Sequence, residues 1–254
     1  MNYNEEIKKI ADFYDKRAKK GDGVSAAGQW GDKNQVSLIC EEINTKIGLN
    51  EKQKVLEIGC GTGVLGRWLS HHCEIYVGCD ISLFMLKKFK EEFQNNIEIY
   101  QSVTHLIPFK ENFFDIVVMN GVTMYLHDKD LLKKTLNEIK RVAKKNSTIF
   151  LGENITPEGY YWELTWFQNL STSKQRIAKL YINLRRWLAK QSSLFEGKWK
   201  TMHKEISPSF IENYFMGNKV EISDAAARTT RKKQLGENYK GNRRIDFVIK
   251  LREK

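Results

Sequence analysis

Hydrophobic residues are spaced along the chain in two different periods. Short continuous apolar runs, which are typical of buried strands, occupy 55–58, 75–79, 97–100, 116–119, 148–151, 220–222 and 245–251. Between them, apolar residues recur every three or four positions, which predicts amphipathic helices over 4–19, 36–47, 64–69, 82–93, 128–143 and 174–190. Strands and helices that alternate in this way predict an α/β fold, with a mostly parallel sheet and helices on both of its faces.

The pattern changes after residue 153. The stretch 154–216 carries aromatic residues between 160 and 167, then the basic helix 174–190, and a further helix that starts at Ser207-Pro208. We therefore predict a single domain over 1–254, in which 1–50 forms a helical cover and 154–216 a helical insertion between the fifth and sixth strands. The link between the last two strands, roughly 223–244, is longer than a minimal hairpin.

Residues 55–63 read Val-Leu-Glu-Ile-Gly-Cys-Gly-Thr-Gly, so a short apolar run ends in three glycines separated by single small residues. Helical spacing resumes directly afterwards with Val64, Leu65 and Trp68, which indicates a buried strand, a tight turn and a helix N-terminus. Glycines at such a turn permit positive φ and let the backbone approach a ligand closely. The helix N-terminus presents free N–H groups to that ligand.

An acidic residue follows the second apolar run. Asp80 ends the run 75–79 and lies 21 residues after Gly59. This separation is close to the roughly 20 residues expected for an acid at the tip of the second strand of a nucleotide-binding β-α-β unit. At that position the carboxylate can accept hydrogen bonds from both hydroxyls of a ribose.

Residues 57–63 together with Asp80 resemble the Rossmann-like (class I) methyltransferases that use S-adenosylmethionine (SAM), of the small-molecule type. The resemblance implies a seven-stranded sheet whose last strand is antiparallel, and SAM as the cofactor. A dinucleotide site is the competing interpretation, because 61–66 matches G-x-G-x-x-G. In dinucleotide sites the first glycine of this motif directly follows the strand. Here the glycine that directly follows the strand is Gly59, which lies before the matching residues 61–66. This difference favours the methyltransferase interpretation.

The resemblance places the cofactor beyond the carboxyl ends of the strands. The residues expected to bind it are Tyr14, Glu57, Gly59, Cys60, Gly61, Gly63, Asp80, Ile81, Ser102, Val103 and Asn120. Tyr14 belongs to a Phe-Tyr-Asp segment that matches the family's leading helix, where it either reaches the methionine carboxylate or only packs the helix onto the domain. Ser102 and Val103 stand where the family often has an acid that binds adenine, so we expect the Ser102 hydroxyl or backbone groups to replace it.

Methyl transfer from SAM requires donor and acceptor to be held in line, which can supply about 7–11 kcal/mol of barrier reduction. An oxygen or nitrogen acceptor can also need a base to take its proton. The candidates are Tyr125, His127 and Glu153, with His105 as a weaker one. Tyr125 stands where many relatives carry a histidine, although packing alone also explains it, and His127-Asp128 equally resembles a helix N-cap region.

The formal net charge of +11 is unevenly distributed. Residues 171–254 carry 20 Lys and Arg against 8 Asp and Glu, a net of +12, whereas residues 1–170 sum to −1. This favours an acidic partner for the C-terminal third, with a well-solvated surface as the alternative. We expect a small acceptor that is anionic, glycosylated or lipid-linked, and the resemblance implies that the insertion 154–216 determines which acceptor is recognised. RNA or protein methylation is the alternative, and a SAM-binding protein without catalysis is a third hypothesis.

The four cysteines, Cys40, Cys60, Cys73 and Cys79, show no C-x-x-C spacing. Cys73 follows two histidines, but reduced thiols are the preferred interpretation and we expect no metal. The first residues lack the apolar core of a signal peptide, and no run approaches the roughly 20 apolar residues that span a bilayer. These features predict a cytoplasmic protein with at most peripheral membrane contact.

Overall fold

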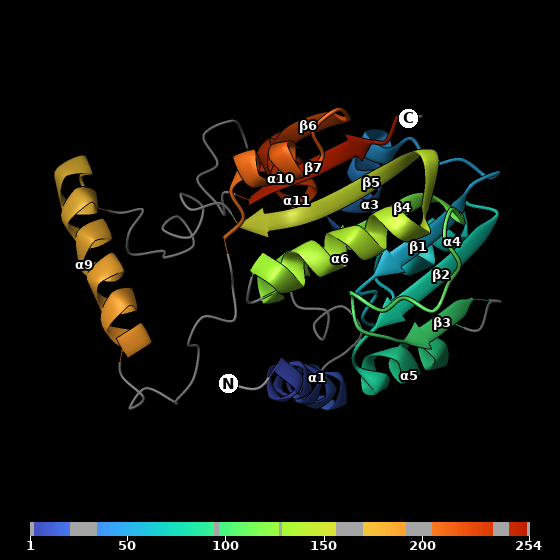
Figure 1. The fold of residues 1–254 in the computed structure, drawn as a ribbon, viewed down its shortest axis with the longest axis horizontal. Helices are drawn as coiled ribbons and strands as arrows, with labels where there is room; N and C mark the ends of the chain where they lie inside the picture. Colours follow the sequence, from blue (N-terminus) through green and yellow to red (C-terminus); the bar gives the residue numbers. More distant parts are fainter. Residues whose placement is uncertain are drawn as a thin grey trace.

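The chain folds around one seven-stranded sheet (Figure 1). The structure is a computed structural model that describes residues 3–20, 35–93, 97–126, 129–155, 170–191, 205–235 and 244–252. The strands are β1 (Lys54–Ile58), β2 (Ile75–Asp80), β3 (Glu98–Gln101), β4 (Phe114–Asn120), β5 (Ala143–Ile155), β6 (Lys219–Asp224) and β7 (Arg244–Lys250). Their order across the sheet is β3-β2-β1-β4-β5-β7-β6.

The sheet is parallel from β3 to β5 and antiparallel at its other edge. β1 pairs in parallel with β2 and β4, and the outer neighbours β3 and β5 extend this parallel arrangement. β7 runs antiparallel to both β5 and β6. The predicted fold class is therefore confirmed, including the reversed last strand.

Helices cover both faces of the sheet. They are α1 (Tyr3–Lys20), α3 (Val36–Ile47), α4 (Gly66–Ser70), α5 (Leu83–Glu92), α6 (Lys129–Val142), α9 (Thr172–Gln191), α10 (Pro208–Tyr214) and α11 (Ala226–Leu235), with a 3₁₀ turn η2 (Thr123–Tyr125). α6 and α10 pack on one face, and α3, α4, α5 and α11 on the other. The central strand β4 serves both cores, since Val117 and Met119 belong to the first and Ile116 and Val118 to the second. A strand buried on both faces has a continuous apolar run, as observed.

Local signals in the sequence explain where several helices begin and end. Ser82 caps α5, because its hydroxyl oxygen accepts a hydrogen bond from the Met85 N–H at 3.1 Å. α3 ends at Gly48, whose φ of 67° is the left-handed conformation that favours glycine. α6 buries Leu132, Leu136 and Ile139, the stripe from which it was predicted. These elements confirm the helical periodicity.

Three boundaries differ from the prediction. β5 begins at Ala143, directly after α6, although its first residues include polar 144–147 and carry no apolar pattern. The helix expected over 64–69 is the single short turn α4. The link between β6 and β7 contains α11, which buries only small side chains such as Ala226 and Ala227 and therefore gives little periodic signal.

The insertion begins and ends at one point of the sheet. β5 ends at Ile155, and the backbone N–H of Ile206 donates to the Ile155 carbonyl at 2.8 Å. α9 lies inside the insertion and stands apart from the sheet in Figure 1. The predicted aromatic cluster at 160–167 lies outside the described residues. Each helix in the described ranges is too short or too polar to cross a bilayer.

Candidate functional site

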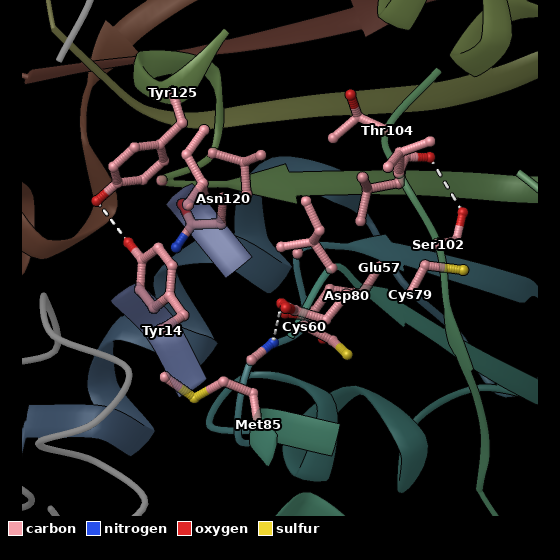
Figure 2. A pocket seen from close by; sticks show the side chains of 18 of the residues that line it. Tyr14, Glu57, Cys60, Cys79, Asp80, Met85, Ser102, Thr104, Asn120 and Tyr125 are labelled. Carbon is pink, nitrogen blue, oxygen red and sulfur yellow. Dashed lines mark hydrogen bonds between the residues drawn. The ribbon is translucent and has the colours of Figure 1, made fainter. Parts of the chain in front are cut away.

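A cavity opens at the carboxyl ends of β1, β2 and β4 (Figure 2). Its lining is Ile7, Ile10, Tyr14, Glu57, Ile58, Gly59, Cys60, Gly61, Val64, Leu65, Cys79, Asp80, Ile81, Met85, Ser102, Val103, Thr104, His105, Asn120, Gly121, Val122, Tyr125, Leu126 and Leu131. It encloses about 1100 Å³ of empty space, its open mouth included. Ten of the eleven residues expected to bind the cofactor line it, and the eleventh, Gly63, lies in the turn beside it.

The glycine turn after β1 is fixed to β2 by its backbone. The N–H groups of Gly59 and Cys60 both donate to the Cys79 carbonyl, at 2.7 and 3.0 Å. Gly61 has a φ of 54°, and a Cβ added there would meet no atom within 4 Å. The turn therefore leaves open space at Gly61, next to the cavity that this residue lines.

Asp80 lies at the tip of β2 and faces this turn. Its Oδ2 accepts the Gly61 N–H and its Oδ1 accepts the Ser82 N–H, both at 2.8 Å. Burial raises the pKa of the Asp80 carboxyl, and the hydrogen bonds from Ser82 and Gly61 act in the opposite direction. A third backbone hydrogen bond, from Ile81, also lowers this pKa. A carboxylate offers about four lone-pair positions, so Asp80 keeps acceptor capacity for a ligand in the cavity.

Glu57 is a buried carboxyl in the wall of the cavity, with only 4% of its surface exposed. The Tyr76 hydroxyl donates to its Oε2 at 2.6 Å. Burial raises the pKa of Glu57 to about 8, although the Tyr76 hydrogen bond lowers it. Glu57 is therefore largely protonated at neutral pH in this structure.

Tyr14 and Tyr125 meet across the cavity (Figure 2). The Tyr14 hydroxyl donates to the Tyr125 oxygen at 2.5 Å, and the two rings make an edge-to-face contact. Burial, together with the neighbouring Tyr125, raises the pKa of Tyr14 above its ordinary value, so its hydroxyl keeps its proton. Because Tyr14 belongs to α1 and Tyr125 to η2, this bond joins two segments that are 111 residues apart.

Asp15 holds α1 against the start of α5. Its Oδ1 accepts hydrogen bonds from the Ser82 hydroxyl and from the Phe84 N–H. Since Ser82 also donates its N–H to Asp80, this one serine connects α1 to the acid at the tip of β2. The Tyr-Asp pair at 14–15 therefore docks α1 at two points, one on each side of the cavity.

The loop 102–106 forms the wall beyond β3. The Ser102 hydroxyl contacts the carbonyls of Leu106 and Val103, at 2.7 and 3.0 Å, and the Ser102 N–H donates to the Asp80 carbonyl. The serine therefore shapes the loop in addition to lining the cavity. His105 also lines it, and burial, followed by nearby Lys134, lowers the pKa of its imidazole.

Asn120 lies at the end of β4 and points toward the Tyr14–Tyr125 pair in Figure 2. On the neighbouring strand, a Cβ at Gly152 would lie 2.0 Å from the Asn120 Oδ1. The absence of a side chain at Gly152 therefore allows Asn120 its place in the cavity wall.

The three principal base candidates lie in different places. Tyr125 lines the cavity, whereas His127 lies outside the described residues. Glu153 is not among the lining residues, and its carboxylate lies 3.7 Å from the Arg244 guanidinium. The Glu153 N–H donates to Asp246 at 2.9 Å, and its φ of 58° marks the register shift between β5 and β7.

Sequence reasoning missed the apolar part of the lining. Ile7 and Ile10 lie in the predicted helix 4–19, Met85 in 82–93 and Leu131 in 128–143, and none of them was expected to line a cavity. Their helical periodicity is the same for a core and for a cavity wall, so only the tertiary structure separates the two roles. All four cysteines are free thiols, as predicted. No three His, Cys, Asp or Glu side chains gather to hold a metal ion in the described ranges.

The fold and the site define a class of protein: an open α/β sheet that binds its ligand beyond the carboxyl ends of the central strands. Residues 56–151 match the family model of the methyltransferase domain. This match runs from β1 into β5, so the part of the sheet that carries the cavity is similar to the methyltransferase domain, and the fold is that of the Rossmann-like methyltransferases.

Curated proteins that match the chain do so at low sequence identity and over part of their length. The chain is 27% identical over 170 residues to a demethylmenaquinone methyltransferase of Paenarthrobacter aurescens, covering 66% of this chain and 64% of that protein. It is 31% identical over 100 residues to the uncharacterized methyltransferase YodH of Bacillus subtilis, covering 38% and 41%. The chain thus spans less than two thirds of these curated relatives.

A solved structure shares the fold over the whole chain. Phosphoethanolamine N-methyltransferase 1 of Haemonchus contortus, in complex with phosphoethanolamine and S-adenosylhomocysteine, matches with a TM-score of 0.70. The identity is 15%, and the match covers 100% of this chain and 50% of that one. At this identity the likeness concerns the fold.

Proposed function

We propose that the protein transfers the methyl group of SAM to an oxygen or nitrogen atom of a small acceptor. The observation that carries this proposal is the Asp80 carboxylate, which is hydrogen-bonded to the Gly61 N–H beside open space in the cavity wall. A glycine-rich turn after β1, with the carboxylate of Asp80 at the end of the neighbouring strand, fits the binding of an adenosine.

The residues present fit this cofactor. Asp80 keeps lone pairs for the ribose hydroxyls, and Gly61 leaves room for the backbone to be approached. Ile81, Ser102 and Val103 would form the adenine side. Glu57, Cys60, Asn120 and Tyr14 would surround the methionine part, together with the other glycines of the turn, Gly59 and Gly63.

Bound SAM supplies an electrophilic methyl group on a sulfonium, so the protein's task is positioning and exclusion of water. α1 performs part of this task, because Ile7 and Ile10 close one side of the cavity with apolar surface. The Tyr14–Tyr125 hydrogen bond fixes α1 over the cavity. The residues thereby shield the site from solvent.

The proposed base is Tyr125, His127 or Glu153, and Tyr125 has the most support. Tyr125 lines the cavity, and its oxygen already accepts one proton donor, Tyr14. The Glu153 carboxylate lies 3.7 Å from the Arg244 guanidinium, and Glu153 is absent from the lining. Tyr125→Phe and Tyr14→Phe remove the same hydrogen bond to α1, so a larger loss of kcat in Tyr125→Phe would support the first assignment.

The acceptor is proposed to be anionic, glycosylated or lipid-linked. The support is the basic C-terminal third, together with the compounds in the names of two similar proteins, a phosphorylated amine for the solved structure and a quinone for the Paenarthrobacter enzyme. RNA or protein methylation is the second candidate, favoured by the same positive charge. RNA binding would lose affinity steeply with added salt, whereas turnover of a small acceptor would change little.

Isothermal calorimetry with S-adenosylhomocysteine tests the cofactor assignment. Asp80→Asn should weaken binding by about 1.5–3 kcal/mol, or about ten- to 150-fold, because charge-assisted hydrogen bonds are lost. Asp115→Asn is the matched control. Asp115 bonds Lys144 and the Lys54 N–H at the amino ends of β4 and β1, away from the cavity at their carboxyl ends. Equal affinity of the two variants, or preferential binding of NADH by the wild type, would overturn the proposal.

A further inference from the structure

α9 carries an apolar stripe on its surface. Ile177, Leu180 and Leu184 follow one another at helical spacing and are 68%, 71% and 55% exposed. Tyr181, in the same stripe, is 56% exposed. These four are among only ten large hydrophobic residues that are exposed in the described part of the chain. The stripe is therefore a concentration of apolar surface, and Figure 1 shows its helix standing apart from the sheet.

The charge of α9 has one sign. Its twenty residues contain six Lys and Arg and no Asp or Glu. At 100° per residue, Lys174 falls along one border of the apolar stripe and Arg176 along the other, with Lys179 on the opposite face. The helix thus presents an apolar centre with positive charge on both sides.

This combination selects one kind of partner. A nucleic acid would complement the cations and leave the apolar stripe in water. A packed protein core would bury the stripe and give the cations no anionic neighbour. The surface of an anionic bilayer takes both parts, since the apolar face enters the acyl boundary and the cations meet lipid phosphates.

We propose that α9 is an interfacial helix that binds the surface of an anionic phospholipid bilayer. This binding goes beyond methyl transfer and requires no cofactor. The insertion that carries α9 leaves and re-enters the sheet at Ile155 and Ile206, on the edge where the cavity opens. If the protein docks through α9, the carboxyl ends of the strands, where the cavity opens, would therefore face the membrane. This orientation suits a lipid-linked acceptor.

Vesicle flotation with the full chain tests the proposal. The wild type should float with phosphatidylcholine vesicles that contain phosphatidylglycerol, less with pure phosphatidylcholine, and less at high salt. Leu180→Asp should reduce the bound fraction about tenfold or more, because it places a charge inside the stripe. Thr172→Asp is the matched control, because it adds the same charge to the polar side of the same helix and should bind nearly as well.

Calorimetry with S-adenosylhomocysteine on both variants checks the fold and separates this proposal from the methyltransferase assignment. If Leu180→Asp fails to fold, Lys174→Glu combined with Arg176→Glu tests the cationic borders and should also abolish flotation. Three results would overturn the proposal. In the first, the wild type does not float with the vesicles. In the second, the two aspartate variants float equally. In the third, Leu180→Asp dissociates a dimer of the wild type, or it lowers the melting temperature while the wild type itself does not bind vesicles.

Discussion

Gly61 and Gly63, in the turn after β1, differ in the atoms that an alanine side chain would contact at each position. A Cβ at Gly61 would have no atom within 4 Å, whereas a Cβ at Gly63 would lie 2.1 Å from the Phe89 ring. Both residues have positive φ, so both substitutions carry a similar backbone strain. The difference between the two alanine variants therefore reports the surroundings of each position.

We predict that Gly61→Ala keeps most of its stability and loses cofactor affinity about tenfold or more, because its methyl group enters the ligand's space. Gly63→Ala should be destabilised by about 2–4 kcal/mol, because Phe89 is fully buried and cannot move aside freely. Thermal unfolding and calorimetry with S-adenosylhomocysteine measure both quantities. The reverse ranking would show that the ligand does not lie against Gly61.

Glu57 makes stability depend on pH. Its pKa in the folded chain is about 8 against 4.5 for the ordinary carboxyl, so the folded state holds a proton that the unfolded state releases. The resulting stability is complete below about pH 4.5 and is lost as the pH rises to about 8. Each pKa unit corresponds to about 1.4 kcal/mol, so the wild type should lose about 3 kcal/mol between pH 5 and 8 through this group.

The neutral variant Glu57→Gln should remove most of that loss, because an amide does not titrate and can still accept the Tyr76 hydroxyl. Denaturant unfolding of both proteins at pH 5 and 8 measures the difference. Parallel pH profiles for wild type and variant would contradict the prediction.

At the scale of elements, α1 is held on the domain by side-chain contacts. Asp15 attaches it to Ser82 and Phe84, and Tyr14 attaches it to Tyr125. Ala18 packs in a small apolar cluster with α5, and its carbonyl accepts a hydrogen bond from Lys88. Because this cluster is small compared with the two cores of the sheet, we expect α1 to open at lower free energy than the strands.

We predict that Tyr14→Phe and Tyr125→Phe each speed the release of S-adenosylhomocysteine several-fold, since each removes the hydroxyl contact that fixes α1. The double variant should release it no faster than the singles, because both changes remove the same hydrogen bond. Stopped-flow displacement gives the three rates. Multiplicative effects in the double variant would mean that the two hydroxyls act independently.

Features whose residues lie close together in the sequence were predicted, and features that join distant residues were not. The glycine turn and Asp80 belong to one β-α-β unit, so spacing alone located them. The Tyr14–Tyr125 contact joins residues 111 positions apart, and no periodic pattern encodes such a pair. α11 was missed because it packs through alanines, and the apolar cavity wall was missed because a wall and a core share one periodicity.

At the scale of the molecule, the cavity and α9 belong to separate parts of the structure. The sheet from β1 to β5 carries the cavity, and the two buried cores are built from the sheet and the helices on its faces. The insertion is joined to this body where the Ile206 N–H meets the Ile155 carbonyl. The two ends of the insertion are thus already adjacent, and a short linker can connect them.

We predict that replacing 156–205 by a short Gly-Ser linker leaves cofactor binding and the melting temperature close to those of the wild type. None of the described side chains of α9 lines the cavity, and Ile206, Ile211 and Phe215 would remain in the core. The same variant should lose turnover of its acceptor and binding to anionic vesicles, because both are assigned to the insertion. Calorimetry, thermal unfolding and flotation measure the three properties. Loss of cofactor binding with a lowered melting temperature would mean that the insertion stabilises the sheet domain, and the assignment of acceptor recognition to it would then have no support.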